Sequence, residues 1–97
     1  MLEYTISAQR ATSGQNTNAY SVTYLLGFEN AGYTNITITK NTNASYCYMD
    51  AYYKNGSIAF NNTGTSYSNS VTNLKSIGGY IYGVNGTYTC EYTIRLT

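Results

Sequence analysis

The chain contains no histidine, no proline and no tryptophan, and only five basic and four acidic residues among its 97. Without histidine it lacks the commonest general base, the commonest metal ligand and the only side chain that titrates near neutral pH when unperturbed. One Asp and three Glu are spread along the chain, and no glycine-rich phosphate loop opens a helix. We therefore expect no enzymatic activity, no cofactor and no metal site.

Charge and long apolar runs are also scarce. The net charge is +1 from scattered basic residues, so there is no patch to attract nucleic acid or anionic lipid. No apolar stretch is long enough to span a membrane, and the segment Met1 to Arg10 shows no signal peptide pattern. Among partners, we therefore expect neither nucleic acid nor membrane insertion.

Polar and aromatic residues of high β-propensity dominate what is present. Thirteen residues are Tyr, and Thr, Asn and Ser together exceed a third of the chain. Branched and aromatic side chains fit a pleated surface, and strong helix formers are scarce, so we predict an all-β fold. The clearest alternation of apolar and polar residues, with a period of two, lies in residues 87–97. A strand there would bury Tyr88, Cys90, Tyr92, Ile94 and Leu96 on one face.

Counting such runs gives eight strands in one domain of residues 1–97. Their approximate bounds are 2–8, 20–28, 34–40, 45–53, 57–61, 66–73, 79–84 and 87–97. We predict an antiparallel two-sheet sandwich and prefer an eight-stranded jelly roll to an immunoglobulin-like arrangement. Residues 1–19 are a candidate extended N-terminal arm or connector, and the polar stretch 9–18 is the one candidate flexible segment.

Several local features refine this prediction. Asn55-Gly56 and Asn85-Gly86 predict two-residue type I′ hairpins, and Gly78-Gly79 predicts a loop or bulge. The continuously apolar segment 20–28 predicts a strand covered on both faces. Residues 46–53 carry aromatic side chains on both faces, which leaves the inward side of that strand undecided.

Cys47 and Cys90 are the only cysteines, and both fall on predicted inward positions. An intramolecular disulfide is the commonest outcome in a two-cysteine β-domain of extracellular composition, and it would stabilise the fold by about 3 to 5 kcal/mol. A bridge between subunits and two free buried thiols are the alternatives. Two thiolates without histidine are too few ligands for zinc.

Asparagines supply two further candidate sites. Five of them begin the pattern of an N-glycosylation acceptor, namely Asn35, Asn43, Asn55, Asn61 and Asn85. Turn formation already accounts for Asn55 and Asn85. The stretch 61–66 matches a calcium-binding pattern of βγ-crystallin-type domains, but no carboxylate lies near it, so we interpret it as a loop.

The tyrosines allow two interpretations. Exposed phenol rings on a flat sheet, surrounded by amides and hydroxyls, could stack on sugar rings and bind carbohydrate. Alternatively, Tyr is the main bulky core residue of a sandwich that is poor in Leu and Phe, with its hydroxyl groups reaching the rim.

Edge protection is conspicuously weak in this sequence. Monomeric β-proteins guard their edge strands with Lys, Pro and inward-pointing charges, but this chain has three Lys and no Pro. Long strands such as 87–97 are therefore poorly guarded against pairing with another copy. Such a chain is either prone to aggregate or built to assemble by strand addition.

The C-terminal third resembles a known family. The segments Thr63 to Ser66, Ser76 to Gly78 and Gly86 to Thr97 are similar to the C-terminal part of the endospore appendage (Ena) subunits of Bacillus-type bacteria. The most specific element is Gly86-x-x-x-Cys90-x-x-Thr-Ile-Arg followed by a short apolar and Thr tail. Unlike that family, this chain has no cysteine before Cys47.

The resemblance implies an eight-stranded jelly roll that polymerises by β-augmentation. In the family, an N-terminal connector carries cysteines that bond to neighbours, one of them to a last-strand cysteine at about the place of Cys90. Because such a connector cysteine is missing here, we favour the internal bridge. The leading hypothesis is a homopolymeric fibre subunit at an extracellular or spore surface; the alternative is a carbohydrate-binding or adhesin module that uses exposed Tyr.

Overall fold

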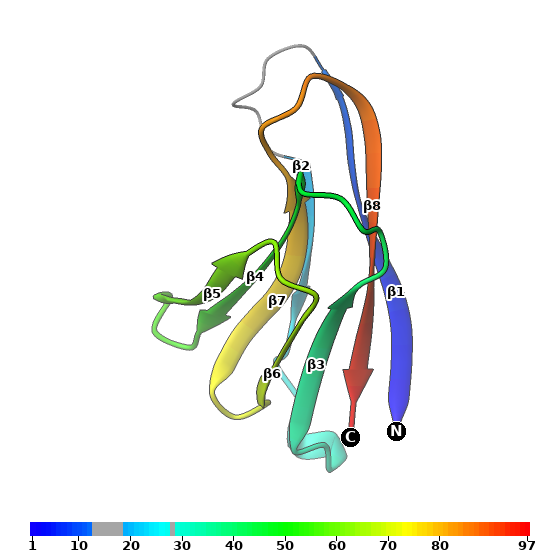
Figure 1. The fold of residues 1–97 in the computed structure, drawn as a ribbon. Helices are drawn as coiled ribbons and strands as arrows, with labels where there is room; N and C mark the ends of the chain where they lie inside the picture. Colours follow the sequence, from blue (N-terminus) through cyan, green and yellow to red (C-terminus); the bar gives the residue numbers. More distant parts are fainter. Residues whose placement is uncertain (13–18, 28) are drawn as a thin grey trace.

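The computed structural model describes residues 1–12, 19–27 and 29–97 and consists of eight strands and one short 3-10 turn (Figure 1). The strands are β1 (Leu2–Thr12), β2 (Ala19–Tyr24), β3 (Asn35–Lys40), β4 (Cys47–Tyr53), β5 (Ile58–Asn62), β6 (Ser66–Ser70), β7 (Leu74–Ile81) and β8 (Gly86–Leu96), and the turn η1 is Glu29–Ala31. Each overlaps a predicted strand, but β7, predicted at 79–84, begins five residues earlier, at Leu74, and ends at Ile81. In the described part of the chain, no helix is long and apolar enough to cross a membrane.

Two antiparallel sheets of four strands form the sandwich. One sheet has the order β1-β8-β3-β6 and is called the β1 sheet below; the other has the order β2-β7-β4-β5 and is called the β2 sheet. The all-β, two-sheet prediction is confirmed. Of the seven connections only β4 to β5 stays within a sheet, which differs from an immunoglobulin-like arrangement and is compatible with the preferred jelly roll.

The first and last strands are paired along their full length. Leu2 lies opposite Leu96 and Thr12 opposite Gly86, so the two chain termini lie side by side at one end of the sandwich (Figure 1). Residues 2–12 of the candidate N-terminal arm therefore belong to the sandwich as β1. Residues 13–18, which include most of the candidate flexible segment, lie outside the described residues.

The core is mainly aliphatic and lies between the sheets. Its fully buried large side chains include Leu25, Ile36, Ile38, Met49, Val71, Leu74, Ile77, Ile81, Ile94 and Leu96. Tyr92 is the one described tyrosine in this fully buried set, and ten other hydrophobic residues, half-buried, pack around the core. The interpretation of Tyr as a bulky core residue therefore applies in part: Ile and Leu fill the centre, while five of the ten half-buried residues around it are tyrosines.

A disulfide joins the two sheets across this core. Cys47 begins β4 in the β2 sheet, Cys90 lies in the middle of β8 in the β1 sheet, and both are completely buried. Their Cα atoms are 5.7 Å apart and the residues are separated by 43 positions. The intramolecular pairing favoured from the sequence is thus the one present in the structure.

The two predicted type I′ turns are not formed. Type I′ needs positive φ at both central residues, but Asn55 and Asn85 both have negative φ, while Gly56 and Gly86 are positive. β4 and β5 do form a hairpin, in which the Gly56 amide bonds to the Tyr53 carbonyl at 2.9 Å, as in a three-residue loop with glycine at the left-handed position. Asn85-Gly86 instead joins strands of different sheets.

Two further local predictions are corrected. Gly78-Gly79 is not a loop but the middle of β7, where the missing side chains admit neighbours that a Cβ would overlap: the Ser21 carbonyl at Gly78 and the Tyr92 ring at Gly79. Strand β2 is not covered on both faces. It pairs only with β7, and Tyr24 is 61% exposed.

Candidate functional site

Four strands form the open edges of the sandwich: β1 and β6 in the β1 sheet, and β2 and β5 in the β2 sheet. None of them contains Lys or Pro, and β2, β5 and β6 contain no charged residue at all. In β1, Arg10 points inward and is buried, whereas Glu3 is held on the outer face by Arg95. The expectation of poorly guarded edges therefore applies to β2, β5 and β6, whereas β1 carries one inward-pointing charge, Arg10, of the kind that guards an edge.

The hydrogen-bond register shows which backbone groups of β1 face outward. Asn41 donates its amide to the Glu91 carbonyl, and Thr97 donates to the Asn35 carbonyl, so the odd-numbered residues of β8 face β3. In an antiparallel sheet the alternate residues face the other neighbour, so the even residues of β8 pair with β1. The amides and carbonyls of Glu3 and Thr5 consequently point away from the sheet.

The free edge of β1 is capped at one point. The Ser21 hydroxyl of β2 donates a hydrogen bond to the Ser7 carbonyl, which joins the edges of the two sheets. On the opposite side of the sandwich, Phe60 of β5 stacks on Tyr67 of β6 with ring centroids 4.4 Å apart. The sandwich is thus held together at both sides, while the outward backbone groups of Glu3 and Thr5 lie beyond the Ser7 cap.

The other edge of the same sheet is similar. By the same alternation, Ser66, Ser68 and Ser70 of β6 direct their backbone groups away from β3. The Ser70 amide is bonded to the Asn69 side chain at 2.7 Å. Both edge strands of the β1 sheet, β1 and β6, therefore direct backbone amides and carbonyls outward, next to the hydroxyl side chains of Thr and Ser residues.

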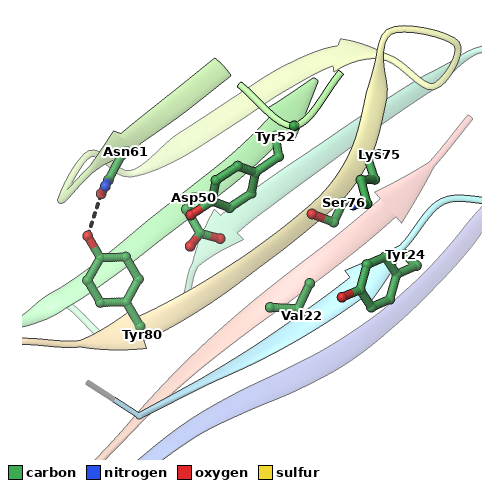
Figure 2. A pocket seen from close by; sticks show the side chains of 9 residues that line it. Val22, Tyr24, Asp50, Tyr52, Asn61, Lys75, Ser76 and Tyr80 are labelled. Carbon is green, nitrogen blue, oxygen red and sulfur yellow. Dashed lines mark hydrogen bonds between the residues drawn. The ribbon is translucent and has the colours of Figure 1, made fainter. Parts of the chain in front are cut away.

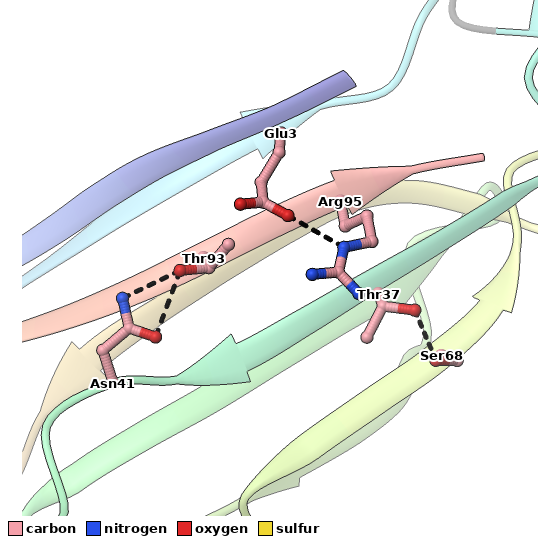
Figure 3. A network of polar contacts seen from close by, with 6 residues as sticks. All are labelled: Glu3, Thr37, Asn41, Ser68, Thr93 and Arg95. Atoms are coloured by element: carbon pink, nitrogen blue, oxygen red, sulfur yellow. Dashed lines mark hydrogen bonds and ion pairs between the residues drawn. The ribbon is translucent and has the colours of Figure 1, made fainter. Parts of the chain in front are cut away.

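The outer face of the β1 sheet is a polar network (Figure 3). The Arg95 Nε atom lies 2.9 Å from Glu3 Oε2, and the Thr37 and Ser68 hydroxyl oxygens lie 2.6 Å apart. The Asn41 amide also bonds to the Thr93 hydroxyl at 2.8 Å. These contacts pair the named polar side chains with one another, and the same face holds a second hollow of about 230 Å³.

A groove lies on the outer face of the other sheet, the β2 sheet (Figure 2). Its volume is about 420 Å³, and it is lined by Val22, Tyr24, Asp50, Tyr52, Gly56, Asn61, Lys75, Ser76 and Tyr80. The structure shows which side of strand 46–53 faces inward, a choice that the sequence left open. Cys47, Met49 and Ala51 face the core, so Tyr48, Asp50 and Tyr52 face outward.

Asp50 lies in this groove between Tyr52 and Tyr80 (Figure 2). Although it belongs to the outer face, it is only 5% exposed, and its Oδ1 atom is buried without a hydrogen-bond partner among the described residues. Burial raises the pKa of the Asp50 carboxyl to about 6, since the charged form loses solvation. The groove thus contains a carboxyl group with unused acceptor capacity.

Tyrosines form one wall of the groove. The rings of Tyr48 and Tyr80 are stacked with centroids 5.0 Å apart, and the Tyr80 hydroxyl donates to the Asn61 side-chain carbonyl. Burial raises the pKa of Tyr80, although the Asn61 hydrogen bond opposes this. The stack and the hydrogen bond hold the Tyr80 ring at a fixed angle beside Asp50.

The structure distributes the predicted glycosylation sites unevenly. Asn35 is half-buried at the start of β3, whereas the other four acceptor asparagines are exposed. Asn55 closes its own turn by accepting from the Ser57 amide at 2.9 Å, and Asn61 accepts from Tyr80. In the predicted calcium-like stretch, Asn62 accepts from the Gly64 amide at 2.6 Å, as a loop residue does.

Sequence analysis missed most of the groove. The alternation of Tyr48, Asp50 and Tyr52 is visible in the sequence, but the contribution of Ser76 and Tyr80 depends on which strand pairs with β4. No group of three or more His, Cys, Asp or Glu side chains that could hold a metal ion occurs within residues 1–12, 19–27 and 29–97.

Comparison with known proteins gives a weak resemblance of fold. No family model and no curated protein matches the chain. Similar solved structures include the SPBc2 prophage-derived protein YomS (10% identity, 100% of this chain and 96% of that one, TM-score 0.45) and a low-affinity xylan-binding module, CBM86, from Roseburia intestinalis (10%, 100% and 97%, 0.45). A third similar structure is that of Bacillus endospore appendages, which form a family of disulfide-linked pili (15% identity, 99% of this chain and 87% of that one, TM-score 0.41). At TM-scores of 0.41 to 0.45, these likenesses assign neither a family nor a function.

Proposed function

We propose that the chain is the structural subunit of a fibre and assembles with further copies of itself by β-strand augmentation. The observation that carries this proposal is the set of edges: four open edge strands without a single Lys or Pro, three of them uncharged. Unguarded edges of this kind pair readily with other chains, and a soluble β-domain normally avoids them.

The placement of the edges fits a fibre better than a closed dimer. β1 and β6 lie at opposite ends of one sheet, and β2 and β5 lie at opposite ends of the other. Joining one edge of a subunit to the opposite edge of the next is a heterologous contact, which propagates as an open filament when the rotation does not close a ring. Each added subunit then presents a new free edge.

The disulfide supports an extracellular or spore-surface location. Cys47 and Cys90 are bonded to each other and completely buried, and stable structural disulfides are typical of oxidising environments. A surface with few charges that is rich in Thr, Asn and Ser also suits a protein that is exposed outside the cell.

Proline at Thr5 tests the assembly proposal. The Thr5 amide points away from β8, so Thr5→Pro removes a donor of the open edge without breaking a hydrogen bond within the sheet. Thr5→Ala is the matched control, because it removes the side chain and keeps the amide. Light scattering and negative-stain electron microscopy should show fibres for the native protein and Thr5→Ala, and shorter or no fibres for Thr5→Pro.

One result would reject this function, and a second would exclude the β1 edge as the site of assembly. The native protein could remain monomeric over a broad concentration range, with no fibre or ring in the micrographs. Alternatively, Thr5→Pro could form fibres as readily as Thr5→Ala while keeping native-like circular dichroism, which would exclude the β1 edge.

Carbohydrate binding is a second candidate function, favoured by one specific observation. The groove on the β2 sheet combines tyrosine side chains with the amide of Asn61 and the carboxyl of Asp50. Aromatic rings and convergent polar groups are what a sugar-binding site requires. A glycan array probed with the labelled protein tests this function, and a clean negative result would remove it.

A further inference from the structure

The strand register brings the residues of the groove together from four strands. On the outer face, Gly78 lies opposite both Val22 of β2 and Asp50 of β4, and Asp50 lies opposite Asn61 of β5. Gly78 adds no side chain to the groove, and its place is taken by the backbone of β2, because a Cβ at position 78 would overlap the Ser21 carbonyl and meet the Val22 Cα. The groove is the depression over Val22, Asp50 and Ser76 on this face.

Aromatic side chains flank this depression along the strands. Two residues before Gly78 in β7, Ser76 lies opposite Tyr24 of β2 and Tyr52 of β4. In the other direction, Tyr80 lies opposite Tyr48 and stacks on it. The depression is thus bounded by Tyr24 and Tyr52 at one end and by the Tyr80 ring at the other (Figure 2).

From this geometry we infer that the groove binds one pyranose unit of a neutral saccharide, with Asp50 accepting hydrogen bonds from its hydroxyl groups and Tyr52 and Tyr80 contacting its ring. The inference rests on the second candidate function, carbohydrate binding, and names its site and ligand class. The groove volume of about 420 Å³ lies within the usual range for small-ligand sites, roughly 300 to 1,000 Å³.

The unpartnered carboxyl oxygen is the strongest independent support. Asp50 Oδ1 is buried and has no donor among the described residues, although a buried acceptor normally has one. A sugar hydroxyl in the groove would supply that donor once the side chains that cover this oxygen move aside. The Asn61 side chain, already bonded to Tyr80, stands beside the same space and has an amide group that can donate as well.

The charges of the lining favour a neutral ligand. Asp50 and Lys75 are its only ionisable residues apart from tyrosines, and they carry opposite charges. Lys75 would repel a cationic ligand and Asp50 would repel an anionic one, so the lining favours neither kind of charge. A neutral polyol can instead donate to the carboxylate and accept from the ammonium group.

Calorimetric titration of the native protein at pH 7.5 with cellohexaose, maltohexaose and chitohexaose tests the inference. At least one of these neutral probes should bind. Asp50→Asn and Tyr52→Ala should each weaken that binding about tenfold or more, as expected for a lost hydrogen bond to a charged group or a lost ring contact. Tyr53→Ala is the matched control, because Tyr53 is the next residue, is 39% exposed and does not line the groove, and it should change affinity less than about twofold.

The possible failures are distinguishable. If no probe binds, both the inference and carbohydrate binding by this chain are rejected. If a probe binds and the loss follows Tyr53→Ala but neither groove variant, the groove assignment is wrong while carbohydrate binding stands. If the groove variants impair fibre formation and leave saccharide affinity unchanged, the groove is a contact between copies. Melting curves of each variant separate loss of binding from loss of fold.

Discussion

The ring of Tyr92, in β8 of one sheet, lies against the bare backbone of Gly79, in β7 of the other. A Cβ at position 79 would overlap three ring atoms of Tyr92. The hydroxyl group of Tyr92 extends to the backbone carbonyl of Tyr48, 2.7 Å away, and to that of Tyr80, 3.3 Å away. One side chain thereby spans the core and hydrogen-bonds the opposite sheet, and glycine is the residue that makes room for it.

Gly79→Ala should destabilise the protein by about 3 kcal/mol. The added methyl group meets a ring that is enclosed between two sheets, so strain must be taken up by the backbone. Urea denaturation followed by circular dichroism measures the effect. Gly64→Ala is the control, since its Cβ meets only the end of the flexible Asn62 side chain, and it should cost less than about 1 kcal/mol. Equal costs at both positions would contradict the packing described here.

Tyr92→Phe should cost about 1 to 2 kcal/mol. The substitution keeps the ring and removes only the hydroxyl group that donates to the Tyr48 and Tyr80 carbonyls in a buried site. Burial raises the pKa of Tyr92, which agrees with a phenol that stays protonated as a donor. Tyr53→Phe, at an exposed position, should leave the free energy of unfolding unchanged within about 0.5 kcal/mol.

Loss of the disulfide should lower stability by about 4 kcal/mol, because the bridge closes a loop whose ends are 43 residues apart. The variant Cys47→Ala with Cys90→Ala, compared with the native protein in urea denaturation, measures this. Non-reducing gels should show a monomer band without a ladder, because both cysteines are already bonded within one chain. A ladder that collapses on reduction would show a bridge between subunits instead.

Asp50→Asn should stabilise the protein at pH 7 and have little effect at pH 4. The folded-state pKa of Asp50 is raised to about 6, so the native state holds its proton more tightly than the unfolded chain, and native stability falls as pH rises from about 4 to 6. Removing the carboxyl abolishes this loss, which amounts to about 1 to 3 kcal/mol. Urea denaturation at both pH values tests it. Glu91→Gln, at an exposed carboxylate, should change stability by less than about 0.5 kcal/mol at either pH.

Regular alternation made the strands predictable. In β8, Cys90, Tyr92, Ile94 and Leu96 are buried as the period-2 pattern requires, because every second side chain of a strand faces the core. The turns were less predictable. Asn-Gly favours a type I′ hairpin locally, but Asn85-Gly86 connects strands in different sheets, so tertiary packing decided its conformation.

Glycines and tyrosines could not be assigned from local pattern alone. Gly78-Gly79 resembles a loop by composition, yet both residues lie in β7, where a neighbouring strand and a tyrosine ring need the space. The four tyrosines of residues 46–53 lie on both sides of their strand, so periodicity could not choose the inward face. The disulfide at Cys47 and the packing of Met49 and Ala51 settle that choice.

The sequence by itself determined the all-β class, the number of strands, the overall scarcity of charge and the absence of histidine chemistry, since these depend on composition and on a two-residue period. Only the tertiary structure decided which strands became edges and which side chains share the outer face. Asp50, Ser76 and Asn61 are far apart in the chain, and they meet because antiparallel pairing of β4 with β7 and β5 places them in adjacent rows. Strand order and register depend on contacts between distant segments, and a local pattern contains no information about which distant strand will be the neighbour.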